Sequence, residues 1–214
     1  MDSSIQDLRR EYRNAGLHEN DLAADPFDQF ERWWSAALKA CAIEPNAMAL
    51  ATSTTDGKPS VRMVLLKGCD PRGLVFYTNF DSRKGAELAA NPRAAVCFWW
   101  GELERQVRVE GRIEFADEAD ADAYFKTRPW YAQIGALASP QSKPIPDRES
   151  LEARVIELAT KFAGGPVPRP KNWGGYRMVP DLFEFWQGRE SRLHDRLCYL
   201  RQTDGSWKIQ RLSP

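Results

Sequence analysis

Three segments of this 214-residue sequence gather cationic, aromatic and hydroxyl side chains that could bind a ligand or take part in a reaction. In the first, Arg83 and Lys84 follow Asp81-Ser82 at the start of a predicted helix, Ser82 to Ala90. Cations at a helix N-terminus oppose the helix dipole, so the arrangement favours a dianion held by backbone N–H groups and both cations. The sequence therefore predicts a phosphate site here, with an ordinary solvated helix start as the alternative.

The second segment is the predicted strand Ser60 to Lys67. Alternate side chains of an extended strand point to opposite faces, so Arg62 and Lys67 leave it in different directions. The third segment carries Arg192, His194 and Arg196 at alternate positions, and a strand here would place two cations and one imidazole on one face. Such like charges repel unless an anion or an electron-rich ring lies between them. A surface strand with a structural histidine is the alternative.

The composition argues against several other chemistries. Thirty basic and thirty acidic residues give no overall field that would attract nucleic acid or an anionic membrane. Four cysteines without a C-x-x-C pair and only two histidines favour neither a zinc site nor a disulfide framework, so we expect reduced thiols and no metal. No apolar run is long enough for a signal peptide or a membrane span, and the cytoplasm is the expected location.

The elements that must position these segments are mainly β. We expect an N-terminal arm, residues 1–25, followed by one domain, residues 26–214. Many short strands joined by tight turns such as Asp56-Gly57, without βαβ alternation, predict an antiparallel barrel with peripheral helices, in the α+β class. The predicted helices are Pro26 to Ala42, Ser82 to Ala90, Asp117 to Thr127 and Arg148 to Ala163. The predicted strands are Ala47 to Thr55, Ser60 to Lys67, Gly73 to Thr78, Ala94 to Trp100, Arg105 to Phe115, Leu182 to Trp186, Arg196 to Arg201 and Trp207 to Leu212.

Taken together, the sequence resembles the pyridoxine/pyridoxamine 5'-phosphate oxidase family nearly from end to end. The resemblance is carried by Leu8 to Tyr12, Asp25-Pro26, Arg62 to Lys67, Val75 to Asn79, Ser82 to Lys84, Leu103 to Val107, Tyr124-Phe125, Arg128-Pro129, Gln133 to Ala136, Gln141-Ser142, Trp173 to Gly175, Glu184 to Gly188, Arg192 to Arg196 and Arg211-Leu212. The segment Arg192 to Arg196 is the most specific to the family. The resemblance implies an FMN-binding split β-barrel that forms a homodimer, with two flavin sites at the subunit interface.

The resemblance also implies roles for individual residues. FMN would contact Arg62, Met63, Val64, Leu65, Leu66, Lys67, Tyr77, Thr78, Arg83, Lys84, Gln106, Gln141, Ser142, Trp186 and Arg196. The substrate would contact Arg9, Arg10, Glu11, Tyr12, Lys67, Tyr124, Arg128, Arg192, Leu193 and His194. Of these, Arg192 and His194 would be catalytic, and Lys67, Tyr124 and Arg128 would hold the substrate phosphate.

The implied reaction is FMN-dependent oxidation of pyridoxamine or pyridoxine 5'-phosphate to pyridoxal 5'-phosphate. Molecular oxygen would be the acceptor, and the products would include H2O2 and, from the amine, ammonia. The sequence departs from the family at Ala132, where a serine usually donates to the substrate phosphate. Losing a hydrogen bond to a charged group would cost roughly 1.5–3 kcal/mol, unless Tyr131 or a water replaces it.

Two other functions are compatible with the pattern. The protein could bind the flavin but act on another substrate, because split-barrel relatives reduce other compounds or use other cofactors. Alternatively, a non-catalytic barrel with exposed Trp99 and Trp100 near Arg93 could stack nucleic-acid bases. The balanced charge argues against nucleic-acid binding.

Overall fold

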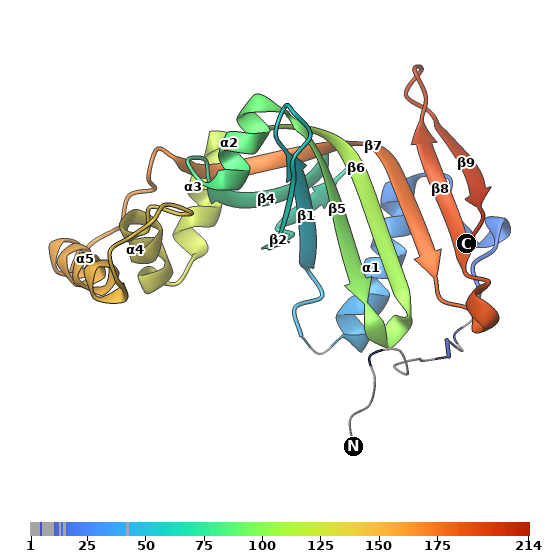
Figure 1. Cartoon of the computed structure of the whole chain (residues 1–214), viewed down its shortest axis with the longest axis horizontal. Coiled ribbons are helices and arrows are strands. Elements are labelled where there is room, and N and C mark those ends of the chain that lie inside the picture. Colours follow the sequence, from blue (N-terminus) through green and yellow to red (C-terminus); the bar gives the residue numbers. More distant parts are fainter. Residues whose placement is uncertain (1–4, 6–10, 13, 15, 42) are drawn as a thin grey trace. The chain divides into compact units, whose positions relative to one another are not determined.

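The structure is a computed structural model, and it describes the chain except residues 1–4, 6–10, 13, 15 and 42 (Figure 1). The described chain forms two compact units. The first comprises the described residues of 1–50 together with Ala95–Gly111 and Pro180–Pro214, and the second comprises Ala51–Ala94 and Arg112–Val179. The predicted division into an arm, residues 1–25, and one domain, residues 26–214, stays a prediction.

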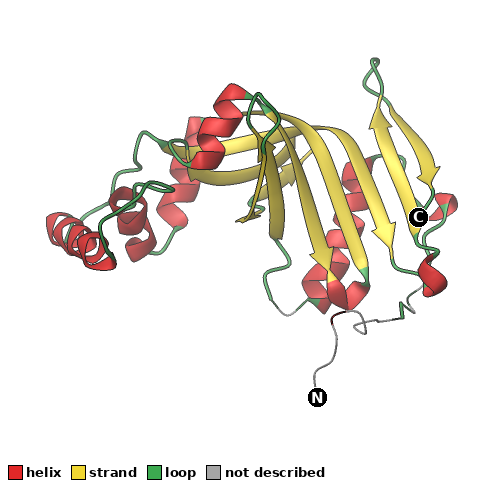
Figure 2. Ribbon diagram, in the orientation of Figure 1, coloured by secondary structure: helices red, strands yellow, loops and turns green. Residues whose placement is uncertain are grey.

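Strands dominate the secondary structure, as Figure 2 shows. The helices are α1 (Pro26–Ala40), α2 (Arg83–Ala90), α3 (Glu118–Thr127), α4 (Trp130–Ala138) and α5 (Arg148–Lys161). The strands are β1 (Ala47–Ser53), β2 (Pro59–Leu65), β3 (Gly68–Asp70), β4 (Gly73–Asn79), β5 (Arg93–Trp100), β6 (Arg105–Phe115), β7 (Trp173–Gln187), β8 (Asp195–Arg201) and β9 (Trp207–Leu212). They pair in the order β2-β1-β5-β6-β7-β4-β3, and β8 pairs with both β7 and β9. The pairs β3–β4, β4–β7, β7–β8 and β8–β9 are antiparallel, which confirms the predicted class.

Aromatic side chains of α1 build the core of the first unit. Asp25 caps the helix by accepting from the Phe27 N–H, and Pro26 occupies the first turn, where its missing N–H leaves no hydrogen bond unmade. Phe30 and Trp33 are buried. The Phe30 ring lies 5.4 Å from that of Phe98, and the Trp33 ring lies 5.3 Å from that of Phe185, measured between centroids.

In the second unit, a cap fixes the start of α2 and three helices form a second apolar cluster. The Ser82 side chain accepts from the Gly85 N–H, so Ser82 rather than Asp81 is the N-cap. Residues from α3, α4, α5, the loop after α5 and the start of β7 share the cluster, namely Phe125, Ile134, Ala138, Leu158, Val167 and Trp173. This packing fixes the helical layer that carries Tyr124 and Arg128.

The structure corrects several sequence predictions. The sequence pattern predicts neither α4 nor β3, and it predicts only the last part of β7. The prediction that Arg192, His194 and Arg196 share one strand face is wrong. Ser191 (φ 56°) and Arg192 (φ 60°) have left-handed backbone conformations within a 3-10 turn, and β8 begins only at Asp195. Trp100 is also buried, so it cannot stack bases.

Two helical glycines are expected to respond in opposite directions to an added methyl group. A Cβ on Gly85 would lie 1.9 Å from the Phe80 carbonyl oxygen, whereas a Cβ on Gly135 would meet nothing within 4 Å. Gly85→Ala should therefore lower the free energy of unfolding by about 1–3 kcal/mol through overpacking. Gly135→Ala should raise it by about 0.5–1 kcal/mol through helix propensity. Urea unfolding of the ligand-free variants measures both, and stabilisation by Gly85→Ala would contradict the close approach.

Candidate phosphate-binding site and aromatic cluster

A cavity of about 560 Å³ in the second unit collects most of the predicted ligand-binding residues. Its lining residues are Ser60, Val61, Arg62, Met63, Val64, Leu65, Lys67, Tyr77, Thr78, Arg83, Lys84, Tyr124, Arg128, Gln141 and Ser142. Five of them are cations and none is a carboxylate. Leu66 is buried and is not among the lining residues. Such a lining favours a multiply charged anion.

Lys84 is the most deeply buried cation of this cavity, at 8% exposed. Its Nζ donates to Thr78 Oγ1 at 3.0 Å, Ser82 Oγ at 3.3 Å and Gln141 Oε1 at 3.2 Å. Among the described residues, no carboxylate lies within ion-pair distance of this ammonium. Burial, together with the nearby Arg62 guanidinium, lowers the pKa of Lys84. The start of α2 thus carries a desolvated positive charge that an anion would stabilise.

Arg62 and Arg83 differ from Lys84 because a buried carboxylate pairs with both. Glu87 accepts from Arg83 Nε at 2.9 Å and from Arg62 Nη2 at 3.2 Å. Burial by itself raises the pKa of the Glu87 carboxyl, but hydrogen bonds from Ser60, Thr52 and Arg83 more than offset it and lower the pKa to about 2. Glu87 is not among the predicted site residues, because its only local signal in the sequence is its four-residue spacing from Arg83.

A second cavity, of about 340 Å³, shares Tyr77, Thr78, Arg128 and Gln141 with the first. Arg128 Nη2 donates to the Ala132 carbonyl at 2.9 Å, and its guanidinium lies 4.9 Å from the centre of the Trp173 ring. Arg128 Nε is buried without a hydrogen-bond partner. A buried donor of this kind is costly unless a ligand satisfies it, so the donor set fits a bound anion here.

Aromatic rings wall the same region. The Tyr77 ring stacks on Tyr124 at 4.3 Å and on Trp173 at 5.6 Å between centroids. Lys67 Nζ lies 5.6 Å from the centre of the Tyr124 ring. Ala132 lines the smaller cavity, but Tyr131 lines neither cavity and is 72% exposed. The geometry therefore gives no support to Tyr131 as a replacement for the missing serine.

The remaining predicted residues that the structure describes belong to the first unit. His194 packs against two other rings, with centroids 4.6 Å from Trp186 and 5.6 Å from Tyr12. Its Nδ1 accepts from the Arg189 N–H at 3.1 Å. Burial, and then the Arg192 charge, lower the pKa of His194. A neutral imidazole with its proton on Nε2 is the form that this hydrogen bond requires.

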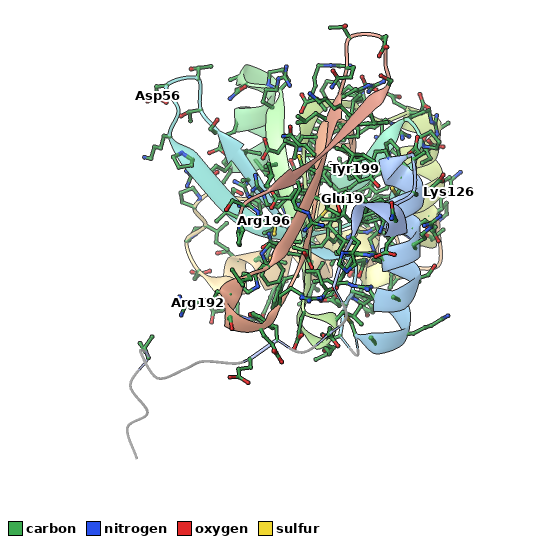
Figure 3. All side chains as sticks on the ribbon, turned by 90° about the vertical axis from the view of Figure 1, so that its right-hand side faces the viewer. Glu19, Asp56, Lys126, Arg192, Arg196 and Tyr199 are labelled. Atoms are coloured by element: carbon green, nitrogen blue, oxygen red, sulfur yellow. The ribbon has the colours of Figure 1, made fainter. Side chains whose placement is uncertain are left out.

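Arg192 and Arg196 lie in different settings, as Figure 3 shows. Arg192 is exposed on the 3-10 turn Glu190–Arg192, and Leu193 beside it lines a cavity of about 400 Å³ together with Tyr12. Arg196, on β8, donates from Nε to the buried Glu184 Oε1 at 2.8 Å. Gln106 is half-buried in β6.

Part of the predicted substrate arm also belongs to this unit. Glu11 is exposed, and Tyr12 joins the aromatic cluster described above. Arg9 and Arg10 lie outside the described residues.

Comparisons with known proteins give a consistent family likeness. Residues 35–162 match the family model described as "Pyridoxamine 5'-phosphate oxidase". Residues 173–214 match "Pyridoxine 5'-phosphate oxidase C-terminal dimerisation region". A pyridoxine/pyridoxamine 5'-phosphate oxidase from Microcystis aeruginosa is 56% identical and covers 100% of both chains. One from Rubrobacter xylanophilus is 59% identical over 97% of this chain and 95% of its own.

Solved structures confirm the predicted split β-barrel fold. PhzG from Burkholderia lata 383, in complex with tetrahydrophenazine-1-carboxylic acid, has a TM-score of 0.86 at 36% identity, covering 91% of this chain and 95% of its own. A pyridoxamine 5'-phosphate oxidase-related, FMN binding protein from Nostoc punctiforme has a TM-score of 0.71 at 18% identity, covering 90% and 100%, and this likeness concerns the fold alone. Within the described residues, no helix is both long and apolar enough to cross a membrane.

The tautomer and pKa of His194 are open to direct measurement, because the chain has only two histidines. Nitrogen-detected NMR should find the His194 proton on Nε2 and a pKa below 6.5, and Arg192→Gln should raise that pKa by removing a nearby positive charge. A His18→Gln variant assigns the two signals. Because the pKa of His194 is lower in the folded than in the unfolded protein, the neutral His194 stabilises the folded state. This stabilisation is present above the unfolded pKa and is lost as pH falls through the folded pKa. A proton on Nδ1 would contradict the hydrogen bond from Arg189.

Proposed function

We propose that this chain, an oxidoreductase that belongs to the pyridoxine/pyridoxamine 5'-phosphate oxidase family, makes pyridoxal 5'-phosphate with FMN as cofactor. Pyridoxine 5'-phosphate and O2 would give pyridoxal 5'-phosphate and H2O2. Pyridoxamine 5'-phosphate, O2 and water would give the same products and ammonia. The observation that carries the proposal is the cavity of the second unit, which five cations line without a carboxylate.

FMN fits the larger cavity by its donor set. Lys84, at the start of α2, offers a desolvated ammonium to the FMN phosphate, and Arg62 and Arg83 offer guanidinium groups. Thr78, Gln141 and Ser142 add hydroxyl and amide groups, and residues 63–67 border the same space. When bound, FMN would supply the two-electron chemistry that amino-acid side chains lack.

The substrate phosphate would bind beside the flavin, on Lys67, Tyr124 and Arg128. All three line the larger cavity, and the partnerless Arg128 Nε is a donor that a phosphate oxygen could satisfy. The Arg128 guanidinium packs on Trp173 and donates to the Ala132 carbonyl, so it would lose less side-chain entropy on binding than a free arginine. The protein's task is then to fix the substrate's orientation relative to the cofactor.

Arg192 and His194 would orient the substrate ring and move protons at the reacting carbon. A neutral His194 can accept or donate near neutral pH, and Trp186 and Tyr12 limit its motion. Gln106, Trp186 and Arg196 would complete the flavin site, and residues 9–12 and Leu193 the substrate site. We also propose a homodimer, supported by the match of residues 173–214 to a dimerisation region.

Product balance tests the proposed reaction. Protein reconstituted with FMN should convert pyridoxamine 5'-phosphate to pyridoxal 5'-phosphate with equal amounts of H2O2 and ammonia. Pyridoxine 5'-phosphate should give H2O2 without ammonia. Pyridoxamine, which lacks the phosphate, is the control and should react with a far lower kcat/KM, because Lys67 and Arg128 have no anion to bind. Flavin reduction without aldehyde formation would point to a different substrate.

Ala132 provides a second test, specific to the substrate phosphate. Ala132→Ser would add a hydroxyl on α4 in the cavity that Arg128 also lines, and KM for pyridoxamine 5'-phosphate should fall by about tenfold, the worth of one hydrogen bond to a charged group. Ala136→Ser, one helical turn later in the same cavity, is the matched control and should leave KM unchanged. If both variants behave as the wild type, the serine hydroxyl is irrelevant in this chain.

A further inference from the structure

Glu87 is the only buried carboxylate among the described residues of the second unit, at 5% exposed. It lies on α2 one turn after Arg83, and it is not among the residues that line the phosphate cavity. Arg62 and Arg83, its two cationic partners, do line the cavity. The carboxylate therefore contacts the two guanidinium groups without itself presenting a negative charge to the cavity, where it would repel an anion.

Two hydroxyl groups also connect Glu87 to Arg62 indirectly, beside the direct ion pair. Arg62 Nη1 donates to Thr52 Oγ1 at 2.7 Å, and Thr52 Oγ1 donates to Glu87 Oε2 at 2.5 Å. Arg62 Nη2 donates to Ser60 Oγ, which donates to the same carboxylate oxygen at 2.5 Å. Each hydroxyl thus accepts from the guanidinium and uses its one proton on the carboxylate. Contacts at both terminal nitrogens fix the plane of the Arg62 guanidinium.

We propose that Glu87 is a positioning residue that, through Arg62, gives the flavin site its preference for a phosphorylated cofactor. This inference rests on the proposed function, because it takes FMN as the occupant of the cavity. Arg62 is a long side chain that would lose rotamer freedom if it were ordered only when the phosphate binds. Thr52, Ser60 and Glu87 order it beforehand, so more of the phosphate interaction is left as binding free energy.

The sign of a charge-removing substitution separates this role from a simple electrostatic one. Glu87→Gln keeps the size of the side chain and makes the surroundings of the cavity more positive by one charge. Electrostatics alone would then strengthen the binding of an anion. Loss of the fixed guanidinium would weaken it. The two effects on FMN affinity oppose each other, and we expect the loss of positioning to be the larger one.

The experiment compares FMN with riboflavin, which has the same ring system without the phosphate. Flavin fluorescence titrations of the apoprotein should show that Glu87→Gln weakens FMN binding by about tenfold, the effect of one hydrogen bond to a charged group, with riboflavin affinity unchanged. Glu152→Gln is the matched control, because Arg148 and Glu152 form the same i,i+4 pair on α5 but are exposed and line neither cavity. It should change neither affinity.

A second variant covers the possibility that Glu87→Gln does not fold. Thr52 is 3% exposed and does not line the cavity, so Thr52→Val removes one connecting hydroxyl without touching the ligand. It should weaken FMN binding selectively, in the same direction. In an Arg62→Lys background, Glu87→Gln should add little further loss, because both changes remove one interaction.

The outcomes are distinguishable. Equal weakening of FMN and riboflavin, unchanged or tighter FMN binding by both variants, or fully additive losses with Arg62→Lys would overturn the positioning role. If the wild-type protein binds neither flavin, the proposed function itself fails. If the wild type prefers FMN over riboflavin and the Glu87→Gln and Thr52→Val variants keep that preference unchanged, the proposed function stands and this inference is wrong.

Discussion

The organisation of the second unit depends on one electrostatic constraint, the presence of several cations around a cavity that offers them no carboxylate. Lys84 is buried with only neutral hydrogen-bond partners, and Arg128 keeps one buried N–H without a partner. Each arrangement costs free energy in the ligand-free protein, since desolvated donors and charges are left incompletely compensated. A phosphorylated ligand removes that cost on binding.

The elements around the cavity hold its cationic side chains in place. The Ser82 cap starts α2 at the point where Lys84 enters the cavity. The α3–α5 layer packs through one apolar cluster and so presents Tyr124 and Arg128 at fixed positions. In the first unit, Arg196 and Arg108 are instead compensated, because both pair with the buried Glu184. Within the described part of the chain, Lys84 and Arg128 thus carry positive charge at the cavity without a carboxylate partner, whereas Glu87 compensates Arg62 and Arg83. A specific anion site requires such local charge, since a general excess of charge would bind anions anywhere.

Local signals in the sequence predict much of this arrangement. The period-two pattern of β6 and the cap of α2 depend on neighbouring residues, and both elements appear where the sequence places them.

The start of β7 is different, because its adjacent glycines normally argue against a strand. They are needed there, since a Cβ on Gly174 would lie 2.6 Å from the Phe80 ring and one on Gly175 would lie 2.8 Å from the Ala116 Cβ. Helix α4 lacks a side-chain cap and charged residues in its first turn, so the local sequence pattern does not predict it. The Glu87 network escapes prediction because Thr52, Ser60 and Arg62 are distant from Glu87 in sequence.

The central claim, that the cation-lined cavity of the second unit is the phosphate site of a flavin, is tested most directly by a crystal structure of the protein with FMN bound. The account predicts that the FMN phosphate lies within hydrogen-bond distance of Lys84 Nζ and the Arg62 guanidinium. An FMN molecule whose phosphate contacts neither side chain would contradict it.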